Sequence, residues 1–517
     1  MGKSVPVPGT EGISSIITAF NGRLFFSVSL IALSQFNFGY DTTVFGTTQA
    51  MAPFTRRFGH LNPKTHKYAI EPYFLSYLNS FPFLGFAFGL VTGSIISRKF
   101  GRRTCVIVMC AWAVIAASIV VSSQHREQLL AGRVLAYIYI GMELAVVPVY
   151  QSELVPARVR GFVVGTYQSG LLIGGLIASV ICRGTSDIKD DASWRIPMGL
   201  FFVVPTIVGT LAWFIPESPR WYLSHGRSDE ALVSLRKLRR GRFSEEEILH
   251  EFADLQTISS LPHEKAWFIE MFQGTNLRRT LIAVGTSSFL QLTGQNFVSA
   301  YGTIYVQSLH TINPFTFGIV SSVISIVTVF LTQYLSDRAG RRPLMIAGSL
   351  VQMGSLFAMG GLGIDKVPSY SARQGITAMV AIFGAGFCLG WAPLSHLITA
   401  EVPSSRLRDQ TYALASVFNV AIQFAVSFSI PYLLYAPYAN LGSKVGFIFG
   451  SIATCALIFS YLCIPELKNR TLEEVDWLFV QGTPIRKFGT AKADIPPVDD
   501  VLSAGSLKTV LDAPSKV

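Results

Sequence analysis

The chain has 517 residues, of which 50% are hydrophobic, 12% are aromatic and only 14% are charged, and its mean hydropathy is +0.44. This composition excludes an ordinary water-soluble protein, because soluble domains carry about 25% charged residues. The formal net charge of +11 is high enough to suit a nucleic-acid-binding protein, so the position of the basic residues along the chain has to be examined.

Apolar stretches of about 20 residues, long enough to cross a bilayer as helices, recur along most of the chain. The first follows a polar lead and is longer than the apolar part of a signal peptide, so we expect it to remain as a membrane span. The predicted spans are 24–46, 73–97, 104–122, 128–150, 161–182, 196–215, 279–306, 315–335, 343–363, 374–400, 410–435 and 442–464.

The long polar stretch between the sixth and seventh spans divides the chain into two halves. Its charge pattern predicts short amphipathic helices over Asp229 to Leu238 and Glu245 to Leu255. After the last span we expect one more helix, Leu472 to Phe479, and then a disordered tail. The predicted parts are a cytoplasmic N-terminal segment, a six-helix half, a cytoplasmic helical linker, a second six-helix half and a cytoplasmic tail: 1–23, 24–215, 216–278, 279–464 and 465–517.

Most of the Lys and Arg residues lie between spans on one side, if both termini are cytoplasmic. The positive-inside rule then fixes the orientation, and topology together with anionic lipid explains the net charge. A basic stripe with interleaved aromatic residues is absent from the sequence, so we exclude nucleic acid as a partner and expect a lipid bilayer.

Three cytoplasmic motifs occur twice, at nearly the same distance along the chain. Phe100-Gly101-Arg102-Arg103 returns as Ala339-Gly340-Arg341-Arg342, Glu153 with Arg160 returns as Glu401 with Arg408, and Pro216-Glu217 returns as Pro465-Glu466. The repeat predicts two parallel six-helix halves, which is typical of a carrier with its substrate site at the bilayer midplane.

Short turns need Gly, and Arg at helix ends satisfies carbonyl groups and pairs with acidic residues of neighbouring helix ends. We therefore expect the repeated charges to latch an inner gate. The predicted gate residues are Arg102, Glu153, Arg160, Glu217, Arg220, Asp337, Arg341, Glu401, Arg408 and Glu466.

These motifs, together with Gln291-Leu292-Thr293-Gly294-Gln295-Asn296 and Arg470-Thr471-Leu472-Glu473-Glu474, resemble the fungal sugar porters of the major facilitator superfamily from about residue 24 to residue 480. The resemblance implies an all-α membrane protein with the major facilitator fold of 12 transmembrane helices. Within the family, Ala400 to Arg408 is similar to the disaccharide (alpha-glucoside and lactose) branch, so the substrate is expected to be a mono- or disaccharide.

Charged residues at membrane depth cost about 2.5–3.5 kcal/mol on insertion scales and rarely persist without a role. Asp41 in the first span and Arg133 in the fourth lie at depths where they could pair, and such a pair acts as a proton switch if it can open. By resemblance, an Asp in this first-helix motif couples protons to sugar in symporters of the family, whereas facilitative members carry a neutral residue. The alternative is a permanent structural ion pair. Glu143, which the family pattern does not lead us to expect, either shares the coupling role or hydrogen-bonds a neighbour.

A sugar offers many hydroxyl groups and no charge, so its site needs amides that donate and accept hydrogen bonds beside an apolar or aromatic wall. Gln291 and Gln295 share one helix face, Gly294 makes a broken seventh helix credible, and Tyr301 is placed to close the outer side. By resemblance, four residues fall on sugar-contacting positions: Gln168, Gln291, Asn296 and Asn419. Trp391 belongs to the tenth-helix motif of the family and is expected to line the passage.

Four residues depart from the family pattern, and the loss of one amide and one indole among them leaves the predicted pocket less polar than a hexose site. They are Leu290, Ser97, Gly175 and His396, which stand where the family has a Gln, an Asp, a polar residue and an aromatic residue. The changes either enlarge the site for a disaccharide or indicate another polyol or small metabolite. His396 is itself a candidate for titration or for contact with the substrate.

Three functions therefore remain open: a proton-coupled sugar importer, a passive or exporting carrier of another metabolite, and a non-transporting sugar receptor. A receptor is expected to carry a long signalling tail, and the stretch after Pro465 is short. The sequence contains no nucleophile elbow, phosphate loop or metal-ligand spacing, so we predict neither an enzyme nor a bound cofactor or metal. We expect a multi-pass protein of the plasma membrane that functions as a monomer, although a vacuolar membrane would leave the same pattern.

Overall fold

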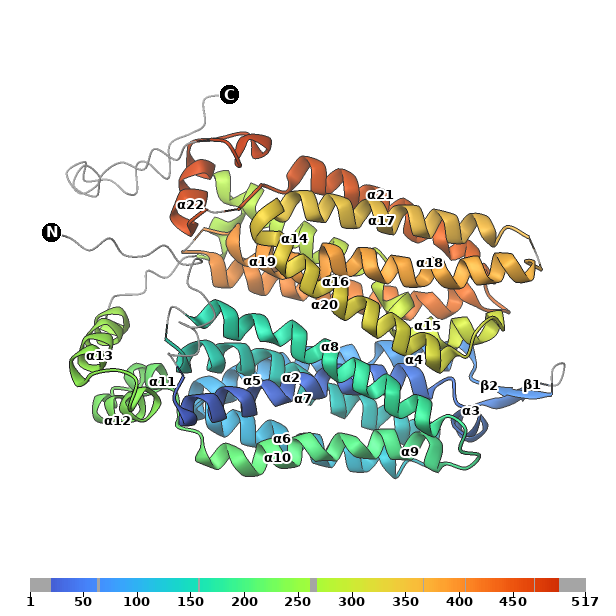
Figure 1. Ribbon diagram of the computed structural model, residues 1–517, viewed down its shortest axis with the longest axis horizontal. Coiled ribbons are helices and arrows are strands. Elements are labelled where there is room, and N and C mark those ends of the chain that lie inside the picture. The colour runs from blue at the N-terminus through green and yellow to red at the C-terminus, as the bar shows by residue number, and fades with distance from the viewer. Residues whose placement is uncertain are drawn as a thin grey trace. The chain divides into compact units, whose positions relative to one another are not determined.

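The computed structural model describes residues 20–62, 66–156, 159–260, 267–365, 367–404, 406–468 and 470–491. These residues divide into two units. Unit 1 has the bounds Met1–Glu71 and Phe81–His263, and unit 2 has the bounds Pro72–Ser80 and Glu264–Val517. Figure 1 colours the chain from blue at its start to red at its end.

Unit 1 contains a bundle whose helices run side by side (Figure 1). Helix α2 packs against α8, α5 packs against α7, and α6 packs against α7 and α10. The elements are α2 (Gly22–Thr48), α5 (Pro82–Phe100), α6 (Arg102–Val121), α7 (Arg126–Leu154), α8 (Arg160–Thr185), α9 (Ala192–Gly199), the 3₁₀ turn η2 (Leu200–Phe202), α10 (Val203–Leu211) and η3 (Ala212–Phe214).

Unit 2 repeats this arrangement. Helix α14 packs against α20, α16 packs against α18, and α17 packs against α18 and α21. The elements are α4 (Pro72–Ser80), η4 (Phe268–Phe272), α14 (Gly274–Leu292), α15 (Gln295–Leu309), α16 (Pro314–Ala339), α17 (Arg341–Leu362), α18 (Tyr370–Leu389), α19 (Trp391–Glu401), α20 (Arg408–Leu434), η5 (Gly442–Lys444) and α21 (Val445–Cys463). Helix α4, which precedes α5 in the chain, packs against α20.

By length and composition, nine helical segments among the described residues could each cross a membrane. The remaining predicted spans are α2, α8 and the interrupted pair α14 and α15, whose places are assigned by the repeated helix pairing. The fold is therefore the predicted one, an all-α membrane protein of twelve helices in two six-helix halves.

Close helix packing in unit 1 depends on small residues. A Cβ atom on Gly89 of α5 would lie 2.2 Å from the Ile138 carbonyl oxygen of α7, and one on Gly174 of α8 would lie 2.0 Å from the Phe36 carbonyl oxygen of α2. Any larger side chain would push the backbones apart, so these glycines set the spacing of the two main helix pairs.

The seventh span is broken as predicted. Helix α14 ends at Leu292, α15 begins at Gln295, and Gly294 between them has a left-handed φ of 92°. A Cβ atom there would lie 2.8 Å from the Phe449 ring. Only glycine adopts this conformation at low cost, so the sequence itself fixes the position of the break.

Short elements lie at the helix ends. Helix α3 (Ala52–Phe58) precedes the antiparallel strands β1 (His60–Asn62) and β2 (Lys67–Ala69), in which Leu61 is opposite Tyr68. Phe54 and Phe58 pack edge-on against the buried Trp194. The sequence pattern does not predict this hairpin.

The linker forms α11 (Pro219–Ser224), α12 (Ser228–Arg239) and α13 (Glu245–Ser260), and the last two confirm the predicted amphipathic helices. Arg239 is 1% exposed and joins three helices of unit 1. It donates to both carboxylate oxygens of Glu251 at 2.9 and 2.8 Å and to the carbonyl of Leu154, the last residue of α7, at 2.8 Å. The linker is therefore anchored to the end of the fourth span.

The helix predicted after the last span is present as α22 (Leu472–Val480), and the 3₁₀ turn η6 (Ile485–Lys487) follows it. Thr471 and Glu474 form a capping box at the start of α22. The buried Arg279 of α14 donates to the Asp476 carbonyl oxygen at 2.9 Å and pairs with its carboxylate. This contact attaches the segment to the seventh span, and the predicted tail from 492 onward lies outside the described residues.

Candidate functional site

The structure brings Asp41 of α2 and Arg133 of α7 together in an ion pair. Arg133 Nη1 donates to the two carboxylate oxygens of Asp41 at 2.9 and 3.0 Å. The two side chains are only 12% and 3% exposed. The guanidinium group also lies 3.8 Å from the centre of the Phe45 ring and 5.0 Å from that of Tyr137. The two charges cancel, which lets the pair exist at membrane depth.

Glu143 lies on the same helix, α7, and is fully buried. Its Oε2 accepts a hydrogen bond of 3.4 Å from the hydroxyl of Tyr167 on α8, and its Oε1 has no partner. No ion pair joins this carboxyl group to a basic side chain of the described residues. Glu143 thus differs from Asp41, whose charge is balanced.

Other buried polar residues between α2 and α7 were not singled out from the sequence. Gln35 donates to Gln151 at 2.7 Å, and Asn37 donates to the hydroxyl of Tyr139 at 3.5 Å. The signal was available, because Asn37 and Asp41 are four residues apart and therefore lie on one face of α2. The interface between these two helices is a continuous polar seam.

Unit 2 gathers several of the predicted sugar-binding amides. Gln291 of α14 donates to Asn419 of α20 at 3.3 Å, and Asn419 donates to the carbonyl of Ser287 at 2.9 Å. Asn296 of α15 donates to the carbonyl of Gln423 at 3.3 Å. The break in the seventh span thus places amides from α14 and α15 beside α20, and we call these three side chains the amide cluster: Gln291, Asn296 and Asn419.

The other predicted sugar-binding residues differ in exposure. Gln168 and Gln295 are half-buried, and Gln295 Oε1 has no hydrogen-bond partner, while His396 is exposed. Tyr301 is fully buried and donates to the Ser427 carbonyl at 2.8 Å. Trp391 is also fully buried, and its indole N–H donates to Ser349 at 2.9 Å. The indole of Trp391, the first residue of α19, thus packs between Ser349 of α17 and Phe289 of α14.

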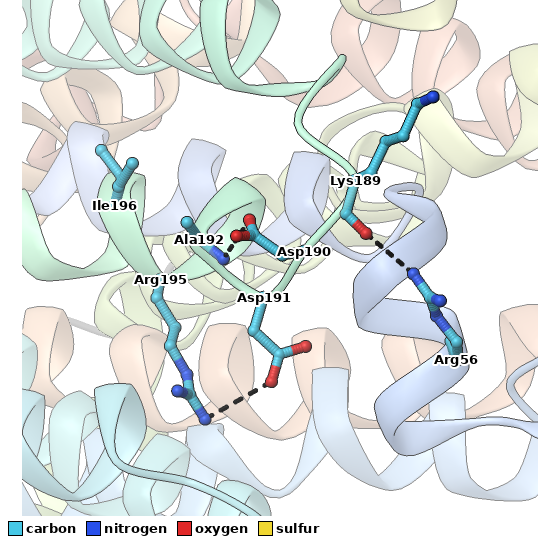
Figure 2. A pocket seen from close by; sticks show the side chains of 7 residues that line it. All are labelled: Arg56, Lys189, Asp190, Asp191, Ala192, Arg195 and Ile196. Atoms are coloured by element: carbon cyan, nitrogen blue, oxygen red, sulfur yellow. Dashed lines mark hydrogen bonds and ion pairs between the residues drawn. The ribbon is translucent and has the colours of Figure 1, made fainter.

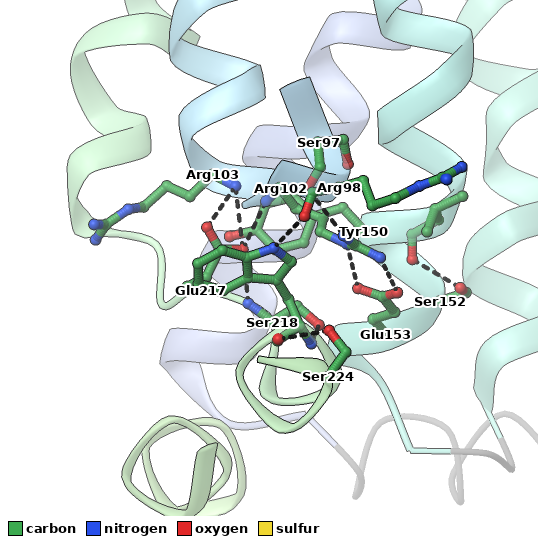
Figure 3. Close-up of polar contacts among 12 residues, drawn as sticks. Ser97, Arg98, Arg102, Arg103, Tyr150, Ser152, Glu153, Glu217, Ser218 and Ser224 are labelled. Atoms are coloured by element: carbon green, nitrogen blue, oxygen red, sulfur yellow. Dashed lines mark hydrogen bonds and ion pairs between the residues drawn. The ribbon is translucent and has the colours of Figure 1, made fainter. Parts of the chain in front are cut away.

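At one end of the helices of unit 1, charged residues join three helices (Figure 3). Arg102 binds Glu153 in a bidentate pair with both distances at 2.9 Å, and it also donates to the Ser97 carbonyl at 3.0 Å. Glu217 accepts hydrogen bonds from the backbone N–H groups of Arg102, Arg103 and Ser218 at 2.9 to 3.0 Å. The carboxylate therefore caps the N-terminus of α6, where the helix dipole favours a negative charge.

The turn before α6 is shaped to admit this carboxylate. Gly101 has a φ of 101°, and a Cβ atom on it would lie 2.3 Å from Glu217 Oε2. Burial raises the pKa of Glu217 above its ordinary value, and the backbone N–H donors oppose that rise. Tyr150 adds a 2.7 Å hydrogen bond to the Pro216 carbonyl, which fixes the segment that carries Glu217.

Unit 2 contains the same device. Glu466 accepts from the backbone N–H groups of Arg341 and Arg342 at 3.0 and 3.1 Å, and Gly340 before them also has a φ of 101°. A Cβ atom on Gly340 would lie 2.5 Å from Glu466 Oε2. The sequence repeat is therefore a structural repeat in which a glycine turn and a carboxylate cap occur together.

The remaining gate residues are placed less completely. The side chains of Arg160 and Asp337 lie outside the described part of the structure. Arg220 is partly exposed and forms no ion pair with a described residue, and Glu401 is half-buried. Arg408 is half-buried too, and its Nε and Nη2 atoms lack hydrogen-bond partners.

Unit 1 also has an open hollow of about 680 Å³ (Figure 2), lined by Arg56 of α3 and by residues 189–192, 195 and 196. Arg56 donates to the Lys189 carbonyl at 2.9 Å, and Arg195 lies 3.6 Å from Asp191. The charged groups in the hollow pair with one another or point to solvent, and none of the predicted site residues lines it. Among the described residues, no group of His, Cys, Asp and Glu is placed to hold a metal ion.

Comparison with known proteins agrees with this fold. Residues 28–479 match the family model described as "Sugar (and other) transporter". The chain is 30% identical to the high-affinity glucose transporter ght2 of Schizosaccharomyces pombe, over 89% of this chain and 88% of that protein. It is 27% identical to the high glucose sensor RGT2 of Saccharomyces cerevisiae. That match covers 92% of this chain but only 62% of the length of the sensor.

Among solved structures, the inward-open xylose transporter XylE from E. coli superposes with a TM-score of 0.73 at 22% identity, covering 88% of this chain and 99% of that chain. At this identity the likeness shows the major facilitator fold alone. The relatives' names refer to glucose and hexoses, so they do not support the leaning toward the disaccharide branch. From the match over residues 28–479 and the relative at 30% identity, we conclude that the chain belongs to the sugar (and other) transporter family of the major facilitator superfamily.

Proposed function

We propose that this protein is a proton-coupled symporter that imports a sugar by alternating access. The observation that carries the proposal is the buried ion pair between Asp41 and Arg133. A proton that binds Asp41 removes one of the two charges, so the pair loses its Coulomb attraction and its helices α2 and α7 are released from each other at that level. Proton binding and helix movement are then linked.

The amide cluster of unit 2 supports a sugar as the substrate. Gln291, Asn296 and Asn419 both donate and accept hydrogen bonds, and none of them carries a charge that a neutral sugar would have to satisfy. Gln295 offers a buried carbonyl oxygen without a donor. The relatives named for glucose favour a monosaccharide of the hexose type over a disaccharide.

The two carboxylate caps give the proposal its inner gate. In unit 1 the Arg102–Glu153 pair and the Glu217 cap connect the ends of α6, α7 and α11. These groups are at the cytoplasmic side by the positive-inside rule, so they hold helix ends together in states in which that side is closed. We place the protein in the plasma membrane as a monomer.

A sugar sensor is the second candidate, because the match to RGT2 runs over 92% of this chain. A passive carrier is the third, and it would leave the Asp41–Arg133 pair as a fixed structural contact. Uptake of radiolabelled glucose separates the sensor from both carriers, since a sensor that does not transport gives no uptake above that of cells without the protein.

The decisive experiment for symport uses yeast that lack their own sugar transporters and express this chain. Maltose, lactose and glucose are added in turn to an unbuffered cell suspension, and the external pH is recorded. We expect glucose to raise the external pH as protons enter with it. An unchanged pH, in cells whose surface carries the protein and takes up labelled glucose, would contradict proton symport and favour the passive carrier.

A further inference from the structure

Helix α7 of unit 1 carries a second buried acid. Glu143 lies ten residues after Arg133 on α7, roughly 15 Å along the helix axis, so it cannot share the ion pair of Asp41. Its side chain is 0% exposed, and therefore it does not face a passage that is open to solvent in this structure. A role in direct contact with sugar is not supported by this position.

The charge balance around Glu143 is the main observation. Two basic side chains of the neighbouring spans are paired elsewhere: Arg133 binds Asp41, and Arg102 binds Glu153. The titratable groups that interact with Glu143 are phenols, namely Tyr167 on α8 and Tyr139 on α7 itself. Helix α2 carries Arg23 in its first turn and then Tyr40 and Asp41, and α5 carries its basic residues, Arg98 and Lys99, only in its last turn. An ionised Glu143 would therefore be a buried charge without a counter-ion, which costs several kcal/mol.

The hydrogen bonds around it favour a proton over a negative charge. Among the described residues, Glu143 Oε1 has no donor, and Oε2 accepts one long hydrogen bond, from Tyr167. On the facing helix α2, the side-chain oxygen atoms of Gln35 and Asn37 also lack donors. Gln151 Nε2 and Arg133 Nε on α7 are unpaired donors, but neither binds Glu143. A carboxylic acid needs fewer donors than a carboxylate, so the single long hydrogen bond at Glu143 suits the protonated form.

We propose that Glu143 is a second proton-binding site of the transporter, separate from the Asp41–Arg133 pair and protonated in the conformation seen here. This inference rests on the proposed symport, and it sets the number of protons that move with each sugar. The proton on Glu143 leaves when the seam between α2 and α7 opens to water during the transport cycle, because hydration removes the penalty on the charged form.

The test uses the purified full-length protein in vesicles clamped at zero membrane potential with an imposed pH gradient. At equilibrium, the accumulation ratio of labelled glucose rises about tenfold per unit of pH gradient for one coupled proton and about a hundredfold for two. We expect the steeper dependence for the wild type and the shallower one for Glu143→Gln, which mimics the protonated acid and keeps the shape of the side chain.

The control is Glu127→Gln, which removes an exposed carboxylate from the first turn of the same helix and should leave the dependence unchanged. A wild type that shows the tenfold dependence, with Glu143→Gln identical to it, would overturn this inference and leave symport through Asp41 intact. A wild type with no dependence on the pH gradient would instead overturn the proposed symport itself.

A second measurement does not depend on transport. Infrared difference spectra of the wild type minus Glu143→Gln at neutral pH should contain the carbonyl stretch of a protonated carboxylic acid. Exchange into heavy water should shift that band. If the difference contains carboxylate bands alone, Glu143 is ionised at rest and the inference is wrong. Sodium dependence of glucose accumulation at constant pH, lost in Glu143→Gln, would also overturn it by showing that the site binds a metal cation.

Discussion

At the scale of single residues, the polar side chains inside unit 1 differ mainly in how their charge is balanced. Asp41 and Arg133 are paired at 2.9 Å and shielded by the rings of Phe45 and Tyr137. Among the described residues, Glu143 has a phenol alone as its hydrogen-bond partner. The charges of the pair balance each other, whereas an ionised Glu143 would lack a counter-ion until water reaches it.

Asp41→Asn tests the coupling role of the ion pair. The amide keeps the shape of the side chain and has no negative charge for a proton to remove, so we expect the variant to lose sugar accumulation while keeping sugar exchange. Accumulation and counterflow of labelled glucose in the same vesicles measure both properties. Asp187→Asn is the matched control, because Asp187 is an 80% exposed carboxylate just after the end of α8. An Asp41→Asn variant that accumulates sugar like the wild type would make the pair purely structural.

Asn419→Ala tests the amide cluster. This side chain accepts from Gln291 and donates to Ser287, so it is held in place to meet a ligand. Loss of one to two hydrogen bonds to sugar should cost about 1–3 kcal/mol, equivalent to roughly a 5- to 150-fold rise in KM. Gln307→Ala, at an exposed position of α15, is the control. The prediction is wrong if KM for glucose in Asn419→Ala equals that of the control.

At the scale of helices and turns, the same combination of a glycine turn and a carboxylate cap occurs in both units. Gly101 with Glu217 and Gly340 with Glu466 place a carboxylate against the first backbone N–H groups of α6 and α17. The sequence repeat predicted charge clusters at these positions. It did not predict the caps, because the partners of each carboxylate are backbone N–H groups, which every residue type except proline supplies.

Gly101→Ala should therefore be destabilising. The new Cβ atom would lie 2.3 Å from Glu217 Oε2, and the alanine would have to adopt a φ of 101°. We therefore expect the free energy of unfolding to fall by about 1–3 kcal/mol and the thermal midpoint in detergent to be lower. Gly226→Ala also has a positive φ, of 71°, but nothing lies within 4 Å of its Cβ position, so it isolates the backbone cost. Equal midpoints for the two variants would show that the carboxylate cap contributes nothing.

Gly89→Val tests the close contact between α5 and α7. The side chain would meet the Ile138 carbonyl, and overpacking of this kind costs about 1–3 kcal/mol. Gly354→Ala on α17 meets no atom within 4 Å and should be neutral or stabilising by up to about 1 kcal/mol, because alanine favours helix. Thermal unfolding should show a lower midpoint for Gly89→Val and an equal or higher midpoint for Gly354→Ala. An unchanged midpoint for Gly89→Val would refute the role of this glycine in helix spacing.

The sequence predicts those elements that are formed by interactions between residues close together in the chain. The twelve spans, the linker helices and the break at Gly294 depend on local hydrophobic runs and glycine, and the sequence predicted each of them. The α3 and β1–β2 region was missed, since its strands are only three residues long. The enclosed Trp391 and the Gln35–Gln151 bond depend on contacts between helices far apart in sequence, which one sequence does not reveal.

At the scale of the whole molecule, the two units share one pattern of helix pairing and one pattern of carboxylate caps, but their buried polar groups differ. Unit 1 contains the ion pair and the lone acid, and unit 2 contains the amide cluster. The proposed roles of the two units follow from this difference. The carboxyl groups of unit 1 bind protons, and the neutral amides of unit 2 bind the hydroxyl groups of the sugar.

The central claim is that a proton gradient drives sugar accumulation through this protein. Its most direct test is uptake of labelled glucose by the purified protein in vesicles whose exterior is more acidic than their interior. Our account predicts that glucose accumulates above the external concentration and leaves again when a protonophore collapses the gradient. Glucose that equilibrates at the same rate but never exceeds the external concentration would contradict the account and identify a passive carrier.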